Sequence, residues 1–143
     1  MAVKMSSNVR IVGVVDDDIS TAIFFHEALR QNIDGISVFS FTDPVKAFEH
    51  FTDNKENYVL VISDLRMPGL NGLELLKKVK TLNPKVRTIL MSAYNFEEEE
   101  LYQQYMKEAV INSTIEKPIT MNILYKRVKD ELNAYQIGIN KKS

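Results

Sequence analysis

The chain of 143 residues contains no cysteine, and this absence removes several kinds of chemistry at once. Without thiols there is no disulfide framework, no thiolate nucleophile and no cysteine-bound zinc or iron–sulfur site. Long apolar runs are also missing, since the longest cover residues 11–15 and 58–62 and a membrane-spanning helix needs roughly 20. We therefore expect a cytoplasmic protein that neither crosses nor binds a membrane.

Neither sign of charge dominates the sequence. Lysine and arginine total 18 against 19 for aspartate and glutamate, which leaves a net charge of -1. A chain so balanced has no general attraction for polyanions, so we predict that nucleic acid is not a partner. Glycine and proline number only 5 and 4, while 45% of residues are hydrophobic, which excludes disordered and collagen-like classes.

The length fits one domain of the usual size, roughly 150 residues. Residues 1–8 lack the apolar core of a secretory signal, and we expect them to form a flexible N-terminal lead. The compact domain is predicted to span residues 9–135. Residues 136–143 are then a short C-terminal tail, too short to fold as an output domain.

Short segments rich in valine, isoleucine and phenylalanine alternate with longer segments of helical periodicity. Their lengths suit strands, and those near the start and the middle of the chain are apolar without alternation, as in strands covered on both faces. Thr42 or Asp43 precedes Pro44 as a helix cap, and Asn71 caps the next helix. The predicted strands are residues 9–15, 36–41, 58–63, 86–91 and 113–116, and the predicted helices are residues 20–31, 44–51, 72–82, 96–109 and 120–135.

This alternation of strands and helices predicts an α/β fold, a doubly wound five-stranded parallel sheet with helices on both faces. Such a sheet binds ligands beyond the carboxyl ends of its strands. Acidic residues follow the first and third predicted strands. Ser92 follows the fourth strand, and Lys117 follows the fifth. We therefore expect carboxylates, a hydroxyl and an amine to meet at one edge.

Asp16 and Asp17 follow the first strand, and Asp64 follows the third. Several like charges so close together are unfavourable unless a cation relieves them, and Mg²⁺ is the natural counter-ion for carboxylates that also handle phosphate. The alternative for residues 16–18 is a solvated turn that caps the following helix.

Asp64 is the candidate nucleophile, because a carboxylate can attack phosphorus to give a mixed anhydride. The transferring group carries negative charge on several oxygens, which Mg²⁺, the Lys117 ammonium and the Ser92 hydroxyl would stabilise. Taken alone, Lys117 reads as a surface lysine and Ser92 as a strand-end hydroxyl. Their shared position at strand ends favours the functional interpretation.

At these residues the sequence resembles the receiver domain of two-component response regulators, from about Val9 to Leu132. The segment around Asp64 is highly specific for that family, and the other motifs are weak alone. The matching motifs are Val-Val-Asp-Asp-Asp at residues 14–18, Val-Ile-Ser-Asp-Leu-Arg-Met-Pro-Gly-Leu-Asn-Gly-Leu-Glu-Leu-Leu at residues 61–76, Met-Ser-Ala at residues 91–93 and Lys-Pro at residues 117–118.

The resemblance implies a role for each site residue. Asp64 would be the phosphoacceptor, Ser92 the switch hydroxyl and Lys117 the phosphoryl contact. The metal ligands of the cofactor Mg²⁺ would be Asp16, Asp17, Asp64 and the backbone carbonyl of Arg66. The resemblance also implies a flavodoxin-like strand order, 2-1-3-4-5, and a cis peptide bond before Pro118.

The function implied is a stand-alone, phosphorylation-dependent signalling switch with the layout of single-domain chemotaxis regulators. It would take its phosphoryl group from a histidine kinase or phosphorelay protein and bind a partner reversibly through the fourth helix, fifth strand and fifth helix. Only self-catalysed phosphotransfer and autodephosphorylation are expected, without turnover of a dedicated substrate. The domain would be a monomer or a phosphorylation-dependent dimer.

The sequence departs from the family pattern near the fifth strand. Thr114 occupies the slot where receivers carry an aromatic residue that moves with the switch hydroxyl. Tyr94 and Tyr105 are the aromatic residues that would have to substitute. His26 and His50 fall in predicted helices and are interpreted as ordinary helix residues, not phosphodonors.

Two other functions are weighed against the switch. A phosphohydrolase of the haloacid dehalogenase type would need a second aspartate two residues after the nucleophile, where this chain has Arg66. A degenerate receiver would act as a phosphorylation-independent interaction module, and Thr114 leaves room for such weak coupling. The intact set of acidic, hydroxyl and lysine residues favours the switch.

Overall fold

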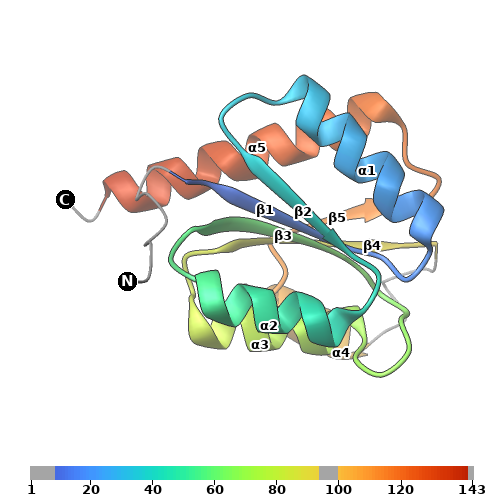
Figure 1. Ribbon diagram of the computed structural model, residues 1–143. Coiled ribbons are helices and arrows are strands. Elements are labelled where there is room, and N and C mark those ends of the chain that lie inside the picture. The colour runs from blue at the N-terminus through green and yellow to red at the C-terminus, as the bar shows by residue number, and fades with distance from the viewer. Residues whose placement is uncertain (1–8, 94–99, 142–143) are drawn as a thin grey trace, which may run out of the picture.

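The computed structural model describes residues 9–93 and 100–141, in which strands and helices alternate along the chain (Figure 1). The strands are β1 (Ile11–Val15), β2 (Ser37–Phe41), β3 (Tyr58–Asp64), β4 (Arg87–Ser92) and β5 (Ser113–Glu116). The helices are α1 (Ile19–Asn32), α2 (Pro44–Asn54), α3 (Gly72–Leu82), α4 (Glu100–Lys107) and α5 (Met121–Asn140).

The five strands form one parallel sheet in the order β2-β1-β3-β4-β5. Figure 1 shows α1 and α5 on one face of the sheet and α2, α3 and α4 on the other. Both the predicted fold class and the strand order implied by the family resemblance are confirmed. The order reverses between β1 and β3, which is the position where sheets of this type bind ligands.

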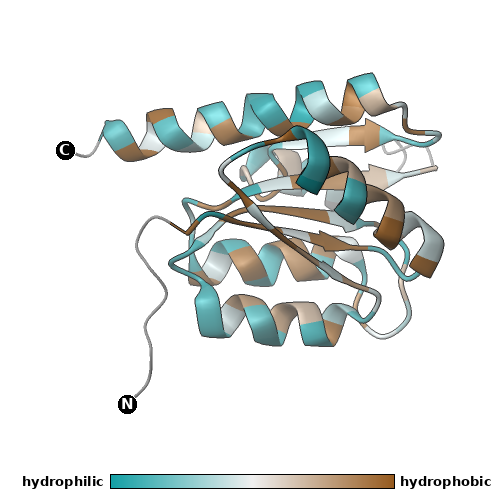
Figure 2. Cartoon of the chain, turned by 45° about the horizontal axis from the view of Figure 1, so that its top comes forward, coloured by the Kyte–Doolittle hydropathy of each residue, from teal (hydrophilic) through white to brown (hydrophobic). Residues whose placement is uncertain are grey.

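The apolar runs of β1 and β3 arise because both faces of these strands are buried. Successive side chains of a strand point to opposite faces. Accordingly, Ile11 and Val15 join the core on the side of α2 and α3, whereas Val12 and Val14 join the core on the side of α1 and α5. Figure 2 shows these central strands as hydrophobic and much of the helical surface as hydrophilic.

The caps that open the helices set most element boundaries. The Asp43 carboxylate accepts a hydrogen bond from the Val45 amide at 2.9 Å, so Asp43 and not Thr42 caps α2. Asn71 caps α3 as predicted, accepting from the Glu74 amide at 2.9 Å. Each side chain satisfies a backbone donor that the first helical turn leaves unpaired.

Among the strands, only that at residues 113–116 is predicted without error at either end.

The last helix is longer than the sequence predicts. It continues to Asn140, so the expected end at Tyr135 is wrong and most of the predicted tail is helical. The apolar pattern does not predict these last turns, because they no longer bury an apolar face: Ile137 is 54% exposed. A helix can continue without such a face. Local bonds continue instead, since the Lys141 amide donates to the Ile137 carbonyl at 3.1 Å.

The helix predicted at residues 96–109 is described only in part, because residues 94–99 lie outside the described ranges. Its described part ends at Lys107, before the predicted end at Ala109. Ala109 has a positive φ of 58°, which a right-handed helix does not accommodate. In the part of the chain that the structure describes, no helix is both long and apolar enough to span a bilayer.

Candidate functional site

Backbone hydrogen bonds beyond the strand ends fix the residues at the carboxyl edge of the sheet. The Asp16 amide donates to the Phe41 carbonyl at 3.1 Å, and the Lys117 amide donates to the Ser92 carbonyl at 2.9 Å. Both bonds continue the parallel ladders past the last paired residues. The side chains of Asp16 and Lys117 therefore start from backbone positions set by neighbouring strands.

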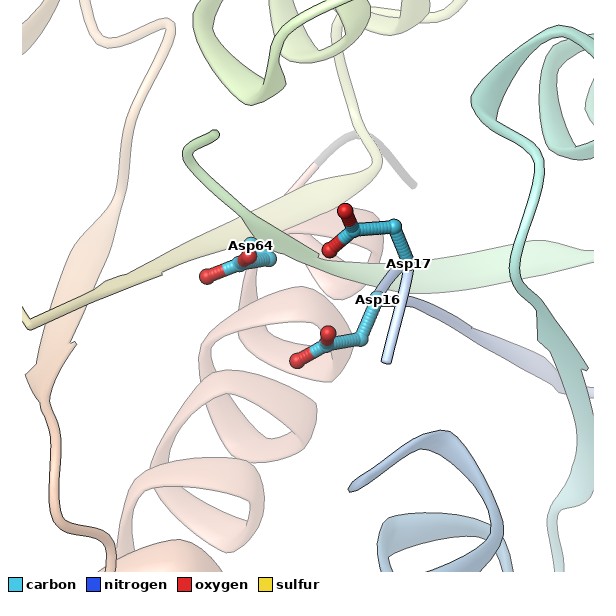
Figure 3. Close-up of side chains that lie close together, drawn as sticks. All are labelled: Asp16, Asp17 and Asp64. Carbon is cyan, nitrogen blue, oxygen red and sulfur yellow. The ribbon is translucent and has the colours of Figure 1, made fainter. Parts of the chain in front are cut away.

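An acidic cluster lies at this edge, formed by Asp16 and Asp17 after β1 and Asp64 at the end of β3 (Figure 3). Carboxylate oxygens from all three residues lie within 4.8 Å of one another. Asp16 is 1% exposed and Asp64 is 9% exposed, whereas Asp17 is open to solvent. Buried like charges this close need a cation, because water screens them poorly.

Lys117 supplies one cation from the other side of the cluster. Its Nζ lies 3.0 Å from an Asp64 carboxylate oxygen and 3.2 Å from an Asp16 carboxylate oxygen. The other oxygen of Asp16 accepts a hydrogen bond from the Asp18 amide at 3.0 Å. Asp16 is thus held at both oxygens, and Lys117 joins the ends of β1, β3 and β5.

The charges in the cluster shift one another's titration. Burial raises the pKa of Asp64, the hydrogen bond from Lys117 opposes this, and the charge of Asp16 adds to it. Burial alone would lower the pKa of Lys117, but its hydrogen bond to Asp64 and the nearby carboxylates outweigh that effect and raise it. One ammonium group therefore faces three carboxylates, so the site retains negative charge for a further cation.

The donor set of this cluster fits Mg²⁺. Hard cations prefer oxygen ligands, and Mg²⁺ binds through a few carboxylates while keeping water and phosphate oxygens in its remaining positions. Asp16, Asp17 and Asp64 offer such oxygens within a small space. Arg66 lies two residues beyond Asp64, in the loop before α3, with an exposed side chain. Its carbonyl as a further ligand stays a prediction.

Ser92 ends β4 directly beside the strand that carries Asp64. The pairing of Asp64 with Met91 places Ser92 one residue beyond that pair, and Ser92 is 1% exposed. Together with Lys117, the sheet therefore brings the predicted hydroxyl, amine and acceptor carboxylate to one edge. The peptide bond between Lys117 and Pro118 is cis, as the resemblance implies.

Gly72 is a site residue that the sequence reasoning missed. A Cβ at this position would overlap the Asp64 carbonyl oxygen, so only glycine allows α3 to begin so close to β3. The Gly72 amide also donates to the Leu65 carbonyl at 2.8 Å. The available signal was a glycine placed directly after the capping residue Asn71, where a helix does not otherwise require one.

Of the two aromatic residues considered as substitutes for Thr114, the structure describes only Tyr105. Thr114 lies on β5, paired with Leu90, and is partly exposed. Tyr94 lies outside the described residues. The ring of Tyr105 is packed against the core on the side of α2 and α3, with the Lys77 ammonium 5.7 Å from its centre.

The two histidines lie in helices and contact neighbouring side chains, as expected for packing residues. His26 on α1 lies 3.1 Å from the Ser40 hydroxyl. His50 on α2 lies 2.7 Å from the Tyr58 hydroxyl, and its ring centre is 4.5 Å from that of Phe39. These contacts give both imidazoles a structural role away from the acidic cluster.

The family profile described as the response regulator receiver domain matches residues 12–129, which include every residue of the candidate site. This chain belongs to that family. As a receiver domain it is a component of two-component signalling. The receiver is 33% identical over 81 residues to sporulation initiation phosphotransferase F of Bacillus subtilis, a match that covers 57% of this chain and 62% of that protein.

Solved receiver structures share the fold. A response regulator receiver domain from Clostridium thermocellum superposes with a TM-score of 0.79 at 23% identity, covering 90% of this chain and 98% of that one. The response regulator TrrA from Thermotoga maritima, solved in complex with Mg²⁺ and BeF, superposes with a TM-score of 0.71 at 24% identity, covering 85% and 98%. At such identities the likeness shows the fold alone.

Proposed function

We propose that this receiver is a phosphorylation-dependent switch that accepts a phosphoryl group on Asp64. The donor is a phosphohistidine on a histidine kinase or a phosphotransfer protein. Phosphorylation then changes how the domain binds a downstream protein. The proposed setting is the cytoplasm, where the domain acts as a monomer or a phosphorylation-dependent dimer.

In the proposed reaction an Asp64 carboxylate oxygen forms a bond to phosphorus while the bond between phosphorus and the histidine nitrogen breaks. The bonding electron pair leaves with the imidazole, and Asp64 becomes an acyl phosphate. Lys117 and Ser92 donate hydrogen bonds to phosphoryl oxygens. Asp16, Asp17, Asp64 and the carbonyl of Arg66 would hold Mg²⁺, which when bound neutralises charge on the transferring group.

One observation carries the proposal most strongly: a lysine ammonium bridges two largely buried carboxylates from different strands. Lys117 contacts both Asp16 and Asp64. Because both carboxylates are largely buried, these charges do not serve to keep the protein surface soluble. Burying such a group of charges is costly, and a purely structural role would be served better by apolar residues. Charges retained at a ligand-binding edge favour chemistry.

The surface beside the acidic cluster suits a protein as phosphodonor. Ile19, Ile23 and Phe24 on α1 are 63%, 55% and 45% exposed. A crevice of about 340 Å³ is lined in part by Phe24, Lys117 and Pro118. Apolar side chains exposed together mark interaction surfaces, and this one would place a donor histidine close to Asp64.

Switching follows from the new charge on Asp64. The phosphoryl oxygens give the Ser92 hydroxyl a stronger hydrogen-bond acceptor, so we expect Ser92 to move towards Asp64. The change would then reach a partner surface formed by α4, β5 and α5. Thr114 is smaller than the ring usual at its position, so this receiver must transmit the change by other contacts.

Amide NMR spectra with Mg²⁺ and beryllofluoride, a phosphoryl mimic, test the switch. The wild type should show shifts at Ser92 and in α4, and D64N should show neither. D130N, which changes an exposed carboxylate on α5, is the matched control and should respond like the wild type. Shifts confined to the Asp64 edge, or identical shifts in D64N, would contradict the proposal.

A further inference from the structure

A polar crevice lies at the amino ends of the strands, at the opposite end of the sheet from the acidic cluster. It has a volume of about 300 Å³. Figure 1 shows the last turns of α5 running beside the start of β1, which forms one side of this region. The lining residues include Arg10 before β1, Glu56 and Asn57 before β3, and Tyr135 and Gln136 on α5.

Backbone hydrogen bonds hold the walls of the crevice in place. The Ile11 amide donates to the Asn57 carbonyl at 2.8 Å, and the Asn57 amide donates to the Asn54 carbonyl at 2.9 Å. The Arg10 carbonyl accepts from the Ser37 amide at 2.8 Å. The backbone on the Arg10 and Asn57 side of the crevice is therefore fixed by hydrogen bonds.

Arg10 has an incomplete set of hydrogen bonds. Its Nε is shielded from solvent and has no hydrogen-bond partner among residues 9–93 and 100–141. A buried donor left unpaired costs about 1–3 kcal/mol, and such groups are rare enough to need a specific explanation. Burial raises the pKa of the Tyr135 phenol, and the nearby charge of Arg10 opposes this rise.

We propose that this crevice binds a small carboxylate, with Arg10 as its anchor. The planar guanidinium presents parallel N–H donors that match the two oxygens of a carboxylate. Asn57 and Gln136 line the same space and offer amide donors beside it. The proposal is independent of phosphorylation, because none of these residues belongs to the Asp64 site.

The other lining residues define the kind of carboxylate. Val9, Val59 and Ile139 line the crevice with aliphatic groups, which suits a short hydrocarbon chain on the ligand. Glu56 also lines it and is exposed, so a ligand with a second carboxylate would be repelled. A monocarboxylate with a small apolar body therefore fits best.

Titration of the isotope-labelled full chain with propionate tests this site, with the Arg10 Nε–H signal and the Asn57 amides as readouts. Propionate should shift these signals saturably, while propionamide, which has nearly the same shape without the charge, should not. R10Q should abolish the response at Asn57, and E56Q should tighten binding. R30Q alters an exposed arginine on α1 and is the matched control, with an unchanged response expected.

Equal shifts with propionamide, a response that persists in R10Q, or no saturable response to propionate would each overturn the proposal. A parallel titration with a short acidic peptide identifies the source of the carboxylate. Weaker binding of the peptide than of propionate supports a free small molecule, whereas tighter binding assigns the carboxylate to a protein side chain. D64N should bind propionate normally, so failure here is distinguishable from failure of the phosphorylation proposal.

Discussion

The acidic cluster at the carboxyl edge of the sheet and the end of α4 differ in the kind of contact that shapes them. At the edge, Asp16 is bonded at both carboxylate oxygens and Lys117 bridges two strands. Near α4, the helix ends against the left-handed residue Ala109, and Thr114 provides no ring to link strand and helix. Phosphoryl chemistry needs side chains that are held in place, whereas transmission of the signal to a partner needs an element of the domain that can shift.

The largest effect should come from removing the cation at the edge. K117A leaves Asp16 and Asp64 facing each other without their shared ammonium group, and it removes a donor to the phosphoryl oxygens. We expect phosphorylation by phosphoramidate to slow by about 100- to 1,000-fold, the cost of losing one charge-stabilising donor. Stopped-flow measurement of the phosphorylation rate at saturating Mg²⁺ checks this.

K126A is the matched control for this variant. Lys126 is an exposed lysine on α5 that pairs with Asp130 at 3.3 Å, and its loss should leave the rate unchanged. Equal rates in K117A and the wild type would mean that the Lys117 ammonium has no part in the chemistry. The claim that the acidic cluster is arranged for phosphoryl transfer would then fail.

The next largest effect concerns the attachment of α5 to the sheet. The buried Glu131 on α5 accepts from Arg87 at 2.7 Å and from the Ser113 hydroxyl at 2.6 Å. These bonds fasten α5 to β4 and β5. E131A should lower the free energy of unfolding by about 3 kcal/mol, because it leaves a partly buried arginine unpaired.

Urea unfolding measures this loss, with D130A as the control on the neighbouring exposed position. That variant should change stability by less than about 0.5 kcal/mol. A similarly small effect of E131A would show that these two bonds contribute little to the attachment of α5.

A smaller loss is expected where α3 meets Asp64. G72A places a methyl group against the Asp64 carbonyl oxygen, and relief requires the helix to move away from β3. We expect about 2 kcal/mol of destabilisation and slower phosphorylation in the folded fraction. G138A is the control, since a Cβ there meets no atom within 4 Å and alanine favours the helix. Normal stability and rate in G72A would refute the idea that this glycine positions the acceptor.

Much of the fold and the acidic edge follows from the sequence, because burial and charge leave local signals. The apolar run of β1 passes directly into Asp16, and such a boundary between core and edge is visible without a structure. The end of α5 was not predictable from the apolar pattern, because its final turns depend on local backbone bonds. The Arg10 crevice was equally hidden, since its walls come from segments far apart in the chain.

The smallest effect concerns the end of α4. Ala109 adopts a positive φ that glycine adopts without a steric penalty, so A109G should raise the free energy of unfolding by about 1 kcal/mol. The residue type itself does not mark this strain, because alanine normally favours helices. Thermal or urea unfolding checks the gain. A134G, in the middle of α5, should destabilise by about 1 kcal/mol, and a loss in both variants would mean that Ala109 is unstrained.

The location of the covalent phosphoryl group tests the central claim most directly. The protein is incubated with phosphoramidate and Mg²⁺ and treated with borohydride, which reduces an aspartyl phosphate to homoserine, and the modified residue is then located by peptide sequencing. The account predicts homoserine at position 64 alone and no modification in D64N. Homoserine at position 16 or 17, or no modification of the wild type, would contradict it.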